Sequence, residues 1–162
     1  MNKLILCEGA TDAILLSYYL ERTAGWKFVR QPPQGVSIRA TEQNEEVTWY
    51  KKHNDYLLIC AVGGKDNFGK FFDDKIQKPL VMSDAFEKIA IVTDRDNREV
   101  SEIETEASAF LKVPCGTIKN NQWNDCSYTN KFRMEKNFFG VAGRHSTGAA
   151  GRIGNRNACI HC

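Results

Sequence analysis

Short, mainly apolar runs, each followed by polar residues, outline the predicted elements of this chain. The runs cover residues 3–7, 56–62 and 88–93. Apolar runs of this length are typical of strands that are buried on both faces of a parallel sheet. We therefore predict an α/β fold whose core contains these strands.

Apolar residues at helical spacing follow each run. They predict helices from Thr11 to about Arg22, over residues 67–77 and over residues 99–111. Gly25 is expected to end the first of these helices. Strands that alternate with helices favour a sheet of parallel strands.

Two segments depart from this pattern. Residues 31–55 are predicted to be an insertion before the second run. Its polar part, residues 41–55, has Trp49 and Tyr50 as its large apolar residues and is predicted to form an exposed excursion or an irregular helix. Residues 143–162 are rich in Gly, Ala, Arg, Ser and Asn and are predicted to be a flexible or atypical tail.

The composition is that of one globular domain. The chain has 162 residues, of which 42% are apolar, which excludes a disordered chain and suits a single domain over residues 1–142. No apolar run approaches the ~20 residues that a membrane span requires. The first run ends at Glu8 without the cleavage site of a signal peptide, so we expect a cytoplasmic protein with no membrane partner.

Basic residues are concentrated in the last third of the chain, although the net charge is only +2. After Glu106 the acids are Asp125 and Glu135, whereas the bases are Lys112, Lys119, Lys131, Arg133, Lys136, Arg144, Arg152 and Arg156. A basic flank beside an acidic centre suits a phosphodiester ligand, and a solvated surface is the alternative explanation.

The six cysteines do not follow a disulfide pattern, so we expect a reducing compartment. Cys7 and Cys60 lie in predicted strands, where a free thiol packs as a small apolar group. Cys159, His161 and Cys162 include metal-ligand types, but the sequence has no second ligand pair at zinc-site spacing.

Acidic side chains follow the first and the third run. Glu8 comes directly after residues 3–7, and Asp94 and Asp96 come after residues 88–93. Asp94 and Asp96 point to the same side of an extended segment, where their repulsion favours a bound cation. If the two strands are neighbours, three carboxylates converge, and such hard oxygen ligands bind Mg²⁺ or Mn²⁺. Glu8 would be a third ligand or a general acid/base, and the alternative is a helix cap or an ion-pair partner.

A glycine-rich turn, Gly63-Gly64-Lys65, follows the second run. Two glycines permit close approach to an anion, and Lys65 adds positive charge, so we predict a phosphate-binding turn. The spacing is not that of a P-loop. An ordinary strand-to-helix turn explains the pattern equally well.

Three motifs, in this order, resemble those of TOPRIM domains: Glu8-Gly9-x-x-Asp12, Gly63-Gly64-Lys65 and Asp94-x-Asp96. The resemblance covers residues 3–112 and is nearest to small stand-alone or OLD-nuclease-like TOPRIM proteins. It implies a Rossmann-like α/β fold with a central, mostly parallel sheet of about four strands flanked by helices.

The resemblance also implies Mg²⁺-dependent making or breaking of phosphodiester bonds, with DNA rather than RNA as the expected partner. Glu8 would be the general acid/base or a metal ligand, and Asp94 and Asp96 would hold the metal. The candidate phosphate-binding residues are Gly9, Gly63, Gly64, Lys65, Arg95 and Arg98. A solvent-facing role is the alternative for the two arginines.

The departures from the family narrow the expected function. The sequence lacks the tyrosine domain of topoisomerases, the zinc and polymerase regions of primases, and the Walker A motif of OLD nucleases. We therefore expect a small metal-dependent enzyme of nuclease or nucleotidyl-transfer type. The alternative is a non-catalytic module that binds nucleic acid or a partner protein, such as an ATPase, in DNA repair or replication. An aspartyl phosphatase is disfavoured, because its Asp-x-Asp usually follows the first strand.

Overall fold

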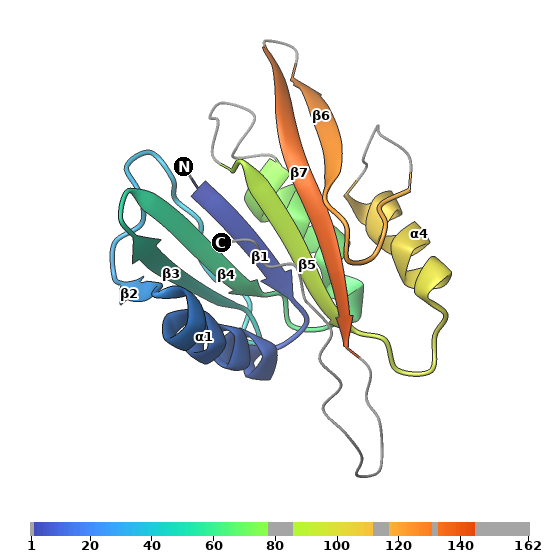
Figure 1. The fold of residues 1–162 in the computed structure, drawn as a ribbon, viewed down its shortest axis with the longest axis horizontal. Helices are drawn as coiled ribbons and strands as arrows, with labels where there is room; N and C mark the ends of the chain where they lie inside the picture. The colour runs from blue at the N-terminus through green and yellow to red at the C-terminus, as the bar shows by residue number, and fades with distance from the viewer. Residues whose placement is uncertain (1, 78–85, 112–116, 131–132, 145–162) are drawn as a thin grey trace.

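A seven-stranded mixed sheet in the order β2-β3-β4-β1-β5-β7-β6 forms the centre of the molecule. The computed structural model describes residues 2–77, 86–111, 117–130 and 133–144. The strands are β1 (Asn2–Cys7), β2 (Lys27–Val29), β3 (Glu46–Lys52), β4 (Asp55–Ala61), β5 (Lys88–Asp94), β6 (Asn124–Asn130) and β7 (Arg133–Arg144). The helical segments are α1 (Ala10–Ala24), η1 (Lys65–Asn67), α2 (Phe68–Phe71), η2 (Phe72–Gln77) and α4 (Val100–Phe110). Helix α1 covers one face of the sheet, and α2, η2 and α4 cover the other (Figure 1).

The middle of the sheet is parallel and its edges are antiparallel. β1 pairs in parallel with both β4 and β5, and β5 pairs in parallel with β7. β3 and β2 extend the sheet beyond β4 in antiparallel pairing, as β6 does beside β7. The predicted α/β class is confirmed. The prediction of about four strands is wrong, because β2, β3, β6 and β7, which flank the three central strands, lack the unbroken apolar runs on which the prediction depends.

Alternating side chains of the parallel strands build one core on each face of the sheet. Leu4 and Leu6 of β1 pack on the side of α2 and α4, whereas Ile5 and Cys7 pack on the side of α1. β4 and β5 alternate in the same way. This period of two explains the unbroken apolar runs, since every position of a central strand faces a core.

β3 corrects the prediction for residues 41–55. Glu46–Lys52 is a strand and not an exposed excursion or an irregular helix. Trp49 packs into the core beside α2 and Tyr50 into the core beside α1, and both are buried. Charged residues at both ends of β3 conceal this short buried centre from a search for apolar periodicity.

The predicted helix over residues 67–77 is present, but it is irregular. A 3-10 turn leads into the single turn of α2, and η2 continues it as a π-helix. The apolar residues that predicted the helix, Phe68, Phe71, Phe72 and Ile76, are all buried in the core.

The predicted tail begins too early. β7 extends to Arg144, so residues 143 and 144 belong to the sheet. The remainder of that tail, with Cys159, His161 and Cys162, lies outside the described residues. In the described part of the chain, no helix combines the length and the apolar character of a membrane span.

Candidate metal centre

The carboxyl ends of three neighbouring parallel strands form the candidate site. β1 lies between β4 and β5, and Cys7 at its end pairs with Ala61 on one side and Val92 on the other. Glu8 therefore leaves the sheet between the turn that follows β4 and the end of β5. In open α/β sheets, ligands bind at this edge.

Backbone hydrogen bonds fix the glycine turn against the end of β1. The amide of Val62 donates to the carbonyl of Cys7 (3.0 Å), and the amide of Gly64 donates to the carbonyl of Glu8 (2.9 Å). Gly63 and Gly64 have φ values of +80° and +127°. Glycine adopts such values without the steric cost that a Cβ imposes, so the turn requires both glycines.

Lys65 joins the two predicted acidic motifs. Its Nζ forms an ion pair with Asp96 Oδ2 and lies 3.9 Å from Glu8 Oε2. The side chains of Lys65 and Glu8 are 22% and 29% exposed, whereas that of Asp96 is 61% exposed. Because the first two side chains are largely shielded, their attraction is screened less than that of a surface pair. Glu8 and Asp96 thus converge on one cationic group.

The conformation of Asp96 differs from the one assumed in the sequence prediction. Asp96 lies in a turn beyond β5 and has φ of +49°, in the left-handed region that aspartate tolerates better than most residues. The premise that Asp94 and Asp96 share an extended segment is therefore wrong. The turn, and not the strand period, brings Asp96 to Lys65.

Asp94 is less closely tied to the centre. It is the last residue of β5, and its backbone pairs with that of Arg144 in β7. Within the described residues, its carboxylate has no hydrogen bond or ion pair. In the same part of the chain, no group of three or more His, Cys, Asp or Glu side chains is arranged to hold a metal ion.

The donor chemistry of the centre nevertheless fits a hard divalent cation. Carboxylate oxygens of Glu8 and Asp96 both lie near a single positive charge, the Lys65 ammonium. Mg²⁺ and Mn²⁺ prefer oxygen ligands of this type. A metal ion between these oxygens would compete with the Lys65 ammonium, since both carry positive charge.

Thr93 is a further residue of the centre that was not predicted from the sequence. It is buried at the end of β5, and its Oγ1 donates a hydrogen bond to Glu8 Oε2 (3.4 Å). Its position one residue before Asp94, on a strand next to β1, is the signal that could have identified it. The contact orients the Glu8 carboxylate.

Gly9 and Asp12 cap a helix. Gly9 is the N-cap of α1, one residue before Ala10, so the helix begins earlier than the predicted start at Thr11. The amide of Gly9 donates to Asp12 Oδ2 (3.2 Å). This hydrogen bond satisfies an amide group that the helix itself leaves free, and it assigns Asp12 a structural role.

The two candidate arginines differ in their surroundings. Arg98 pairs with Glu106 (2.6 Å) and lies 3.9 Å from Glu102, so it is engaged with α4. Arg95 is half-buried, and its Nε has no hydrogen-bond partner among the described residues. Of the two, Arg98 is the one held in ion pairs among the described residues.

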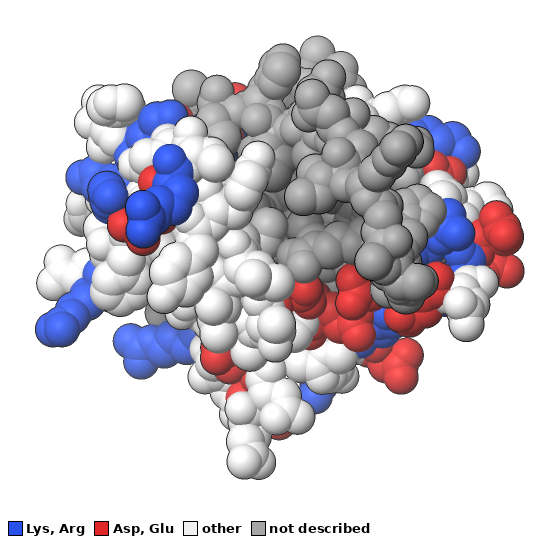
Figure 2. All heavy atoms as spheres, turned by 60° about the horizontal axis from the view of Figure 1, so that its bottom comes forward, with Lys and Arg blue, Asp and Glu red and all other residues white. Residues whose placement is uncertain are grey.

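The basic flank predicted for the last third of the chain lies mostly outside the described side chains. Lys119 is described, and it pairs with Glu104 (2.9 Å). Figure 2 turns the lower side of Figure 1 toward the viewer. On this face the Asp and Glu side chains gather at the lower right with a few basic residues among them, and a separate group of Lys and Arg lies at the upper left.

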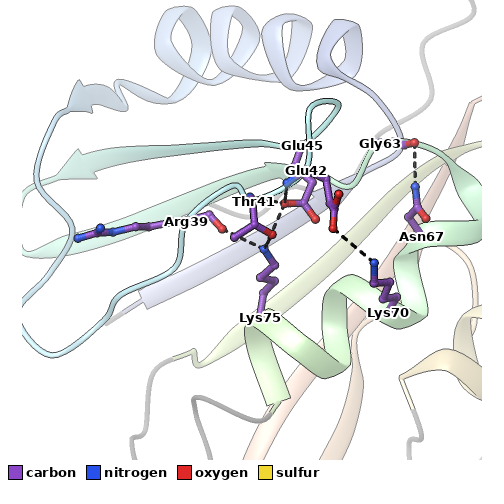
Figure 3. A network of polar contacts seen from close by, with 8 residues as sticks. All are labelled: Arg39, Thr41, Glu42, Glu45, Gly63, Asn67, Lys70 and Lys75. Carbon is purple, nitrogen blue, oxygen red and sulfur yellow. Dashed lines mark hydrogen bonds and ion pairs between the residues drawn. The ribbon is translucent and has the colours of Figure 1, made fainter.

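A polar network fixes the loop that precedes β3 (Figure 3). Glu45 Oε2 accepts hydrogen bonds from the amides of Thr41 (2.8 Å) and Glu42 (3.1 Å) and pairs with Lys75 (3.2 Å). Lys75 also donates to the carbonyl of Arg39 (3.3 Å) and to the hydroxyl of Thr41. Burial alone would raise the pKa of Glu45, but the Thr41 and Glu42 amides and Lys75 outweigh it and hold that pKa below its ordinary value. This network was not predicted from the sequence, because its members lie on separate segments.

Comparisons with known proteins add one finding about the fold. No protein-family model matches the chain, and no curated protein matches it. The structure is similar to the crystal structure of hypothetical protein PH0156 from Pyrococcus horikoshii OT3, with a TM-score of 0.58 and 20% sequence identity. The match covers 90% of this chain and 57% of that protein. At this identity the similarity concerns the fold alone.

Proposed function

We propose that this chain catalyses Mg²⁺- or Mn²⁺-dependent cleavage of phosphodiester bonds in nucleic acid, with DNA as the substrate, as a nuclease-like TOPRIM protein. The observation that carries the proposal is the approach of Glu8 and Asp96 to one cationic group, Lys65. The order of the three motifs along the chain supports it, as does their position at the carboxyl ends of parallel strands.

Each residue of the centre has a proposed role. Glu8 and Asp96 would hold the metal, with Asp94 as the proposed third ligand. A bound divalent ion stabilises negative charge that develops on phosphate oxygens. Lys65 would contact the phosphate once a metal replaces it between the carboxylates. Glu8, whose carboxylate accepts a hydrogen bond from Thr93, would also accept or donate a proton.

A cleavage assay tests the proposal. The purified chain is incubated with single- and double-stranded DNA and RNA while Mg²⁺ or Mn²⁺ is titrated. We expect metal-dependent cleavage of DNA that Glu8→Gln and Asp96→Asn reduce by about a hundredfold or more, the range for loss of a catalytic proton-transfer group. Glu21→Gln is the control, because Glu21 pairs with the exposed Lys27 near the far end of α1. Cleavage that persists in both site variants would reject the centre.

The contact between Lys65 and the carboxylates favours a second candidate function. With Lys65 between Glu8 and Asp96, the charges of the centre are partly balanced without a metal. The chain would then be a non-catalytic module that binds nucleic acid, or a partner protein such as an ATPase, in DNA repair or replication. Binding of DNA that is unchanged in EDTA, without cleavage products in Mg²⁺, would select this alternative.

A further inference from the structure

A pocket lies on the side of the glycine turn that faces the loop before β3. Its volume is about 280 Å³, near the lower end of the range for small-molecule sites. Its walls come from the loop before β3, from the turn after β4 and from α2. The lining residues are Glu42, Gln43, Asn44, Glu45, Val62, Gly63, Asn67, Lys70 and Phe71.

The pocket and the candidate metal centre share the glycine turn. Gly63 and Asn67 line it, and they flank Lys65 in the same short segment. The side-chain amide of Asn67 donates to the carbonyl of Gly63 (2.9 Å), which closes the turn between pocket and centre. A nucleotide whose phosphate lies at Lys65 would pass over this turn to place its base in the pocket.

The chemistry of the pocket suits a flat, polar ring. Val62 and Phe71, which are buried, are the apolar side chains of its lining. The side-chain amides of Gln43 and Asn44 line it and have no hydrogen-bond partner among the described residues. Amide groups of this kind pair with the donor and acceptor edges of nucleobases.

The wall of the pocket is fixed before any ligand binds. Glu45 and Lys75 hold both ends of the loop from Arg39 to Glu45. Glu42 and Lys70 form an ion pair (3.5 Å) that joins this loop to α2 (Figure 3). Gly63 and Asn44 are in such close contact that a Cβ on Gly63 would lie 3.1 Å from Asn44 Cβ. A loop held at several points loses little conformational entropy on binding, which favours a ligand site over an ordinary surface loop.

We infer that this pocket binds the nucleobase next to the phosphate at Lys65, with Asn44 as a base-contacting residue. The inference rests on the proposed function and adds a base subsite to it. A chain with this subsite binds a nucleotide more tightly than the same sugar phosphate without its base. It also discriminates among bases, because one amide edge cannot match all of them equally.

Titrations with single nucleotides test the inference. The uniformly ¹⁵N-labelled chain is titrated in Mg²⁺ with dAMP, dCMP, dGMP, dTMP and deoxyribose 5-phosphate, and amide shifts are followed by NMR. We expect one nucleotide to bind most tightly and to shift the amides of Gly63 and Asn44. Asn44→Ala should weaken the binding of that nucleotide roughly tenfold, the loss expected for one amide–base contact. The binding of deoxyribose 5-phosphate should not change. Asn44→Asp, which keeps the shape but removes the donor, should change the order of base preference.

The control variant is Asn54→Ala, which removes the same side chain from the exposed turn between β3 and β4. Unfolding midpoints of the three variants establish that each is folded. Equal affinity for nucleotides and deoxyribose 5-phosphate, or an Asn44→Ala variant that binds as wild type does, would overturn the inference. Tight binding of DNA with either result would show that the base subsite alone is wrong. Binding of neither nucleotides nor DNA would reject the proposed function with it.

Discussion

Lys65 Nζ lies 3.9 Å from Glu8 Oε2, although the two residues belong to different strand-to-helix connections. The same nitrogen forms an ion pair with Asp96, so one lysine links the ends of all three central strands. A lysine in this position has two consequences that can be measured. It balances the charge of the carboxylates in the free protein, and it competes with a divalent metal for them.

Replacing Lys65 by methionine should separate metal binding from DNA binding. Without the ammonium, Glu8 and Asp96 repel each other, and a metal relieves that repulsion, so Mn²⁺ should bind about three- to tenfold more tightly. DNA should bind more weakly, because a phosphate contact is lost. Electron paramagnetic resonance measures free Mn²⁺, and fluorescence anisotropy measures DNA binding. Lys27→Met is the matched control, since Lys27 pairs with Glu21 on the surface. Weaker or unchanged Mn²⁺ binding by Lys65→Met would show that Lys65 does not compete for the site.

Glu45 should contribute stability that depends on pH. Its pKa in the folded chain lies below the ordinary value of 4.5, so between these two pKa values the unfolded chain binds more protons than the folded chain. The contribution is therefore present above pH 4.5 and is lost as the pH falls through the folded pKa. Glu45→Gln should lower the free energy of unfolding at pH 7 by about 1–2 kcal/mol, since it removes a charge-assisted contact. In this variant the free energy of unfolding should also decrease less steeply as the pH falls.

Urea unfolding at pH values from 7 to about 3 measures both effects. Glu46→Gln is the control, because Glu46 is the exposed first residue of β3. Equal pH profiles for Glu45→Gln and wild type would show that the network around Lys75 does not stabilise the loop.

Alanine at Gly63 should be more destabilising than alanine at Gly35. Both glycines have positive φ, +80° and +86°, so both substitutions carry the same backbone cost of about 1 kcal/mol. A Cβ at Gly35 meets open space, whereas one at Gly63 lies 3.1–3.3 Å from atoms of Asn44. The free energy of unfolding, measured by thermal unfolding, should therefore be lower for Gly63→Ala than for Gly35→Ala by at least about 1 kcal/mol. Equal losses of stability would mean that the loop before β3 moves to accommodate the Cβ at no energetic cost. That result would contradict a fixed wall of the pocket.

Glu104 is expected to join α4 to the segment before β6. The Asn120 amide donates to its carboxylate (2.8 Å) and lowers its pKa against the opposing effect of burial, and Lys119 lowers it further. Glu104→Gln should reduce the free energy of unfolding at neutral pH by about 1–2 kcal/mol, and the loss should shrink below pH 4.5 as the wild-type group is protonated. The control is Glu46→Gln at the exposed first residue of β3. A Glu104→Gln variant as stable as this control would contradict the expected link.

The central strands could be predicted from sequence because every residue in them faces a core. The three apolar runs coincide with these strands. Residues 3–7 lie within β1 and residues 88–93 lie within β5, whereas residues 56–62 lie within β4 except for the last, which follows it. β3 could not be predicted in this way, since only Trp49 and Tyr50 of its residues are fully buried. For such a strand, the neighbouring strands β2 and β4 supply a constraint that the local pattern does not contain.

The candidate site was accessible from sequence only in part. Glu8 and Asp96 follow strands that are neighbours, and that relation could be anticipated from the position of polar residues at strand ends. The contact with Lys65 depends on the left-handed turn at Asp96 and on the two glycines before Lys65, and no periodicity encodes it. Thr93 and the loop fixed by Lys75 became apparent only when distant segments were placed side by side.

Binding of Mn²⁺ to the folded chain tests the central claim most directly. Electron paramagnetic resonance of wild type, Glu8→Gln and Asp96→Asn, each verified as folded by its unfolding midpoint, reports how much Mn²⁺ is bound at each concentration. The account predicts a saturable site in wild type that either substitution weakens by about tenfold or more, because each removes a charged ligand. Equal Mn²⁺ binding by wild type and both variants, or no binding by any of them, would contradict a metal centre at Glu8 and Asp96.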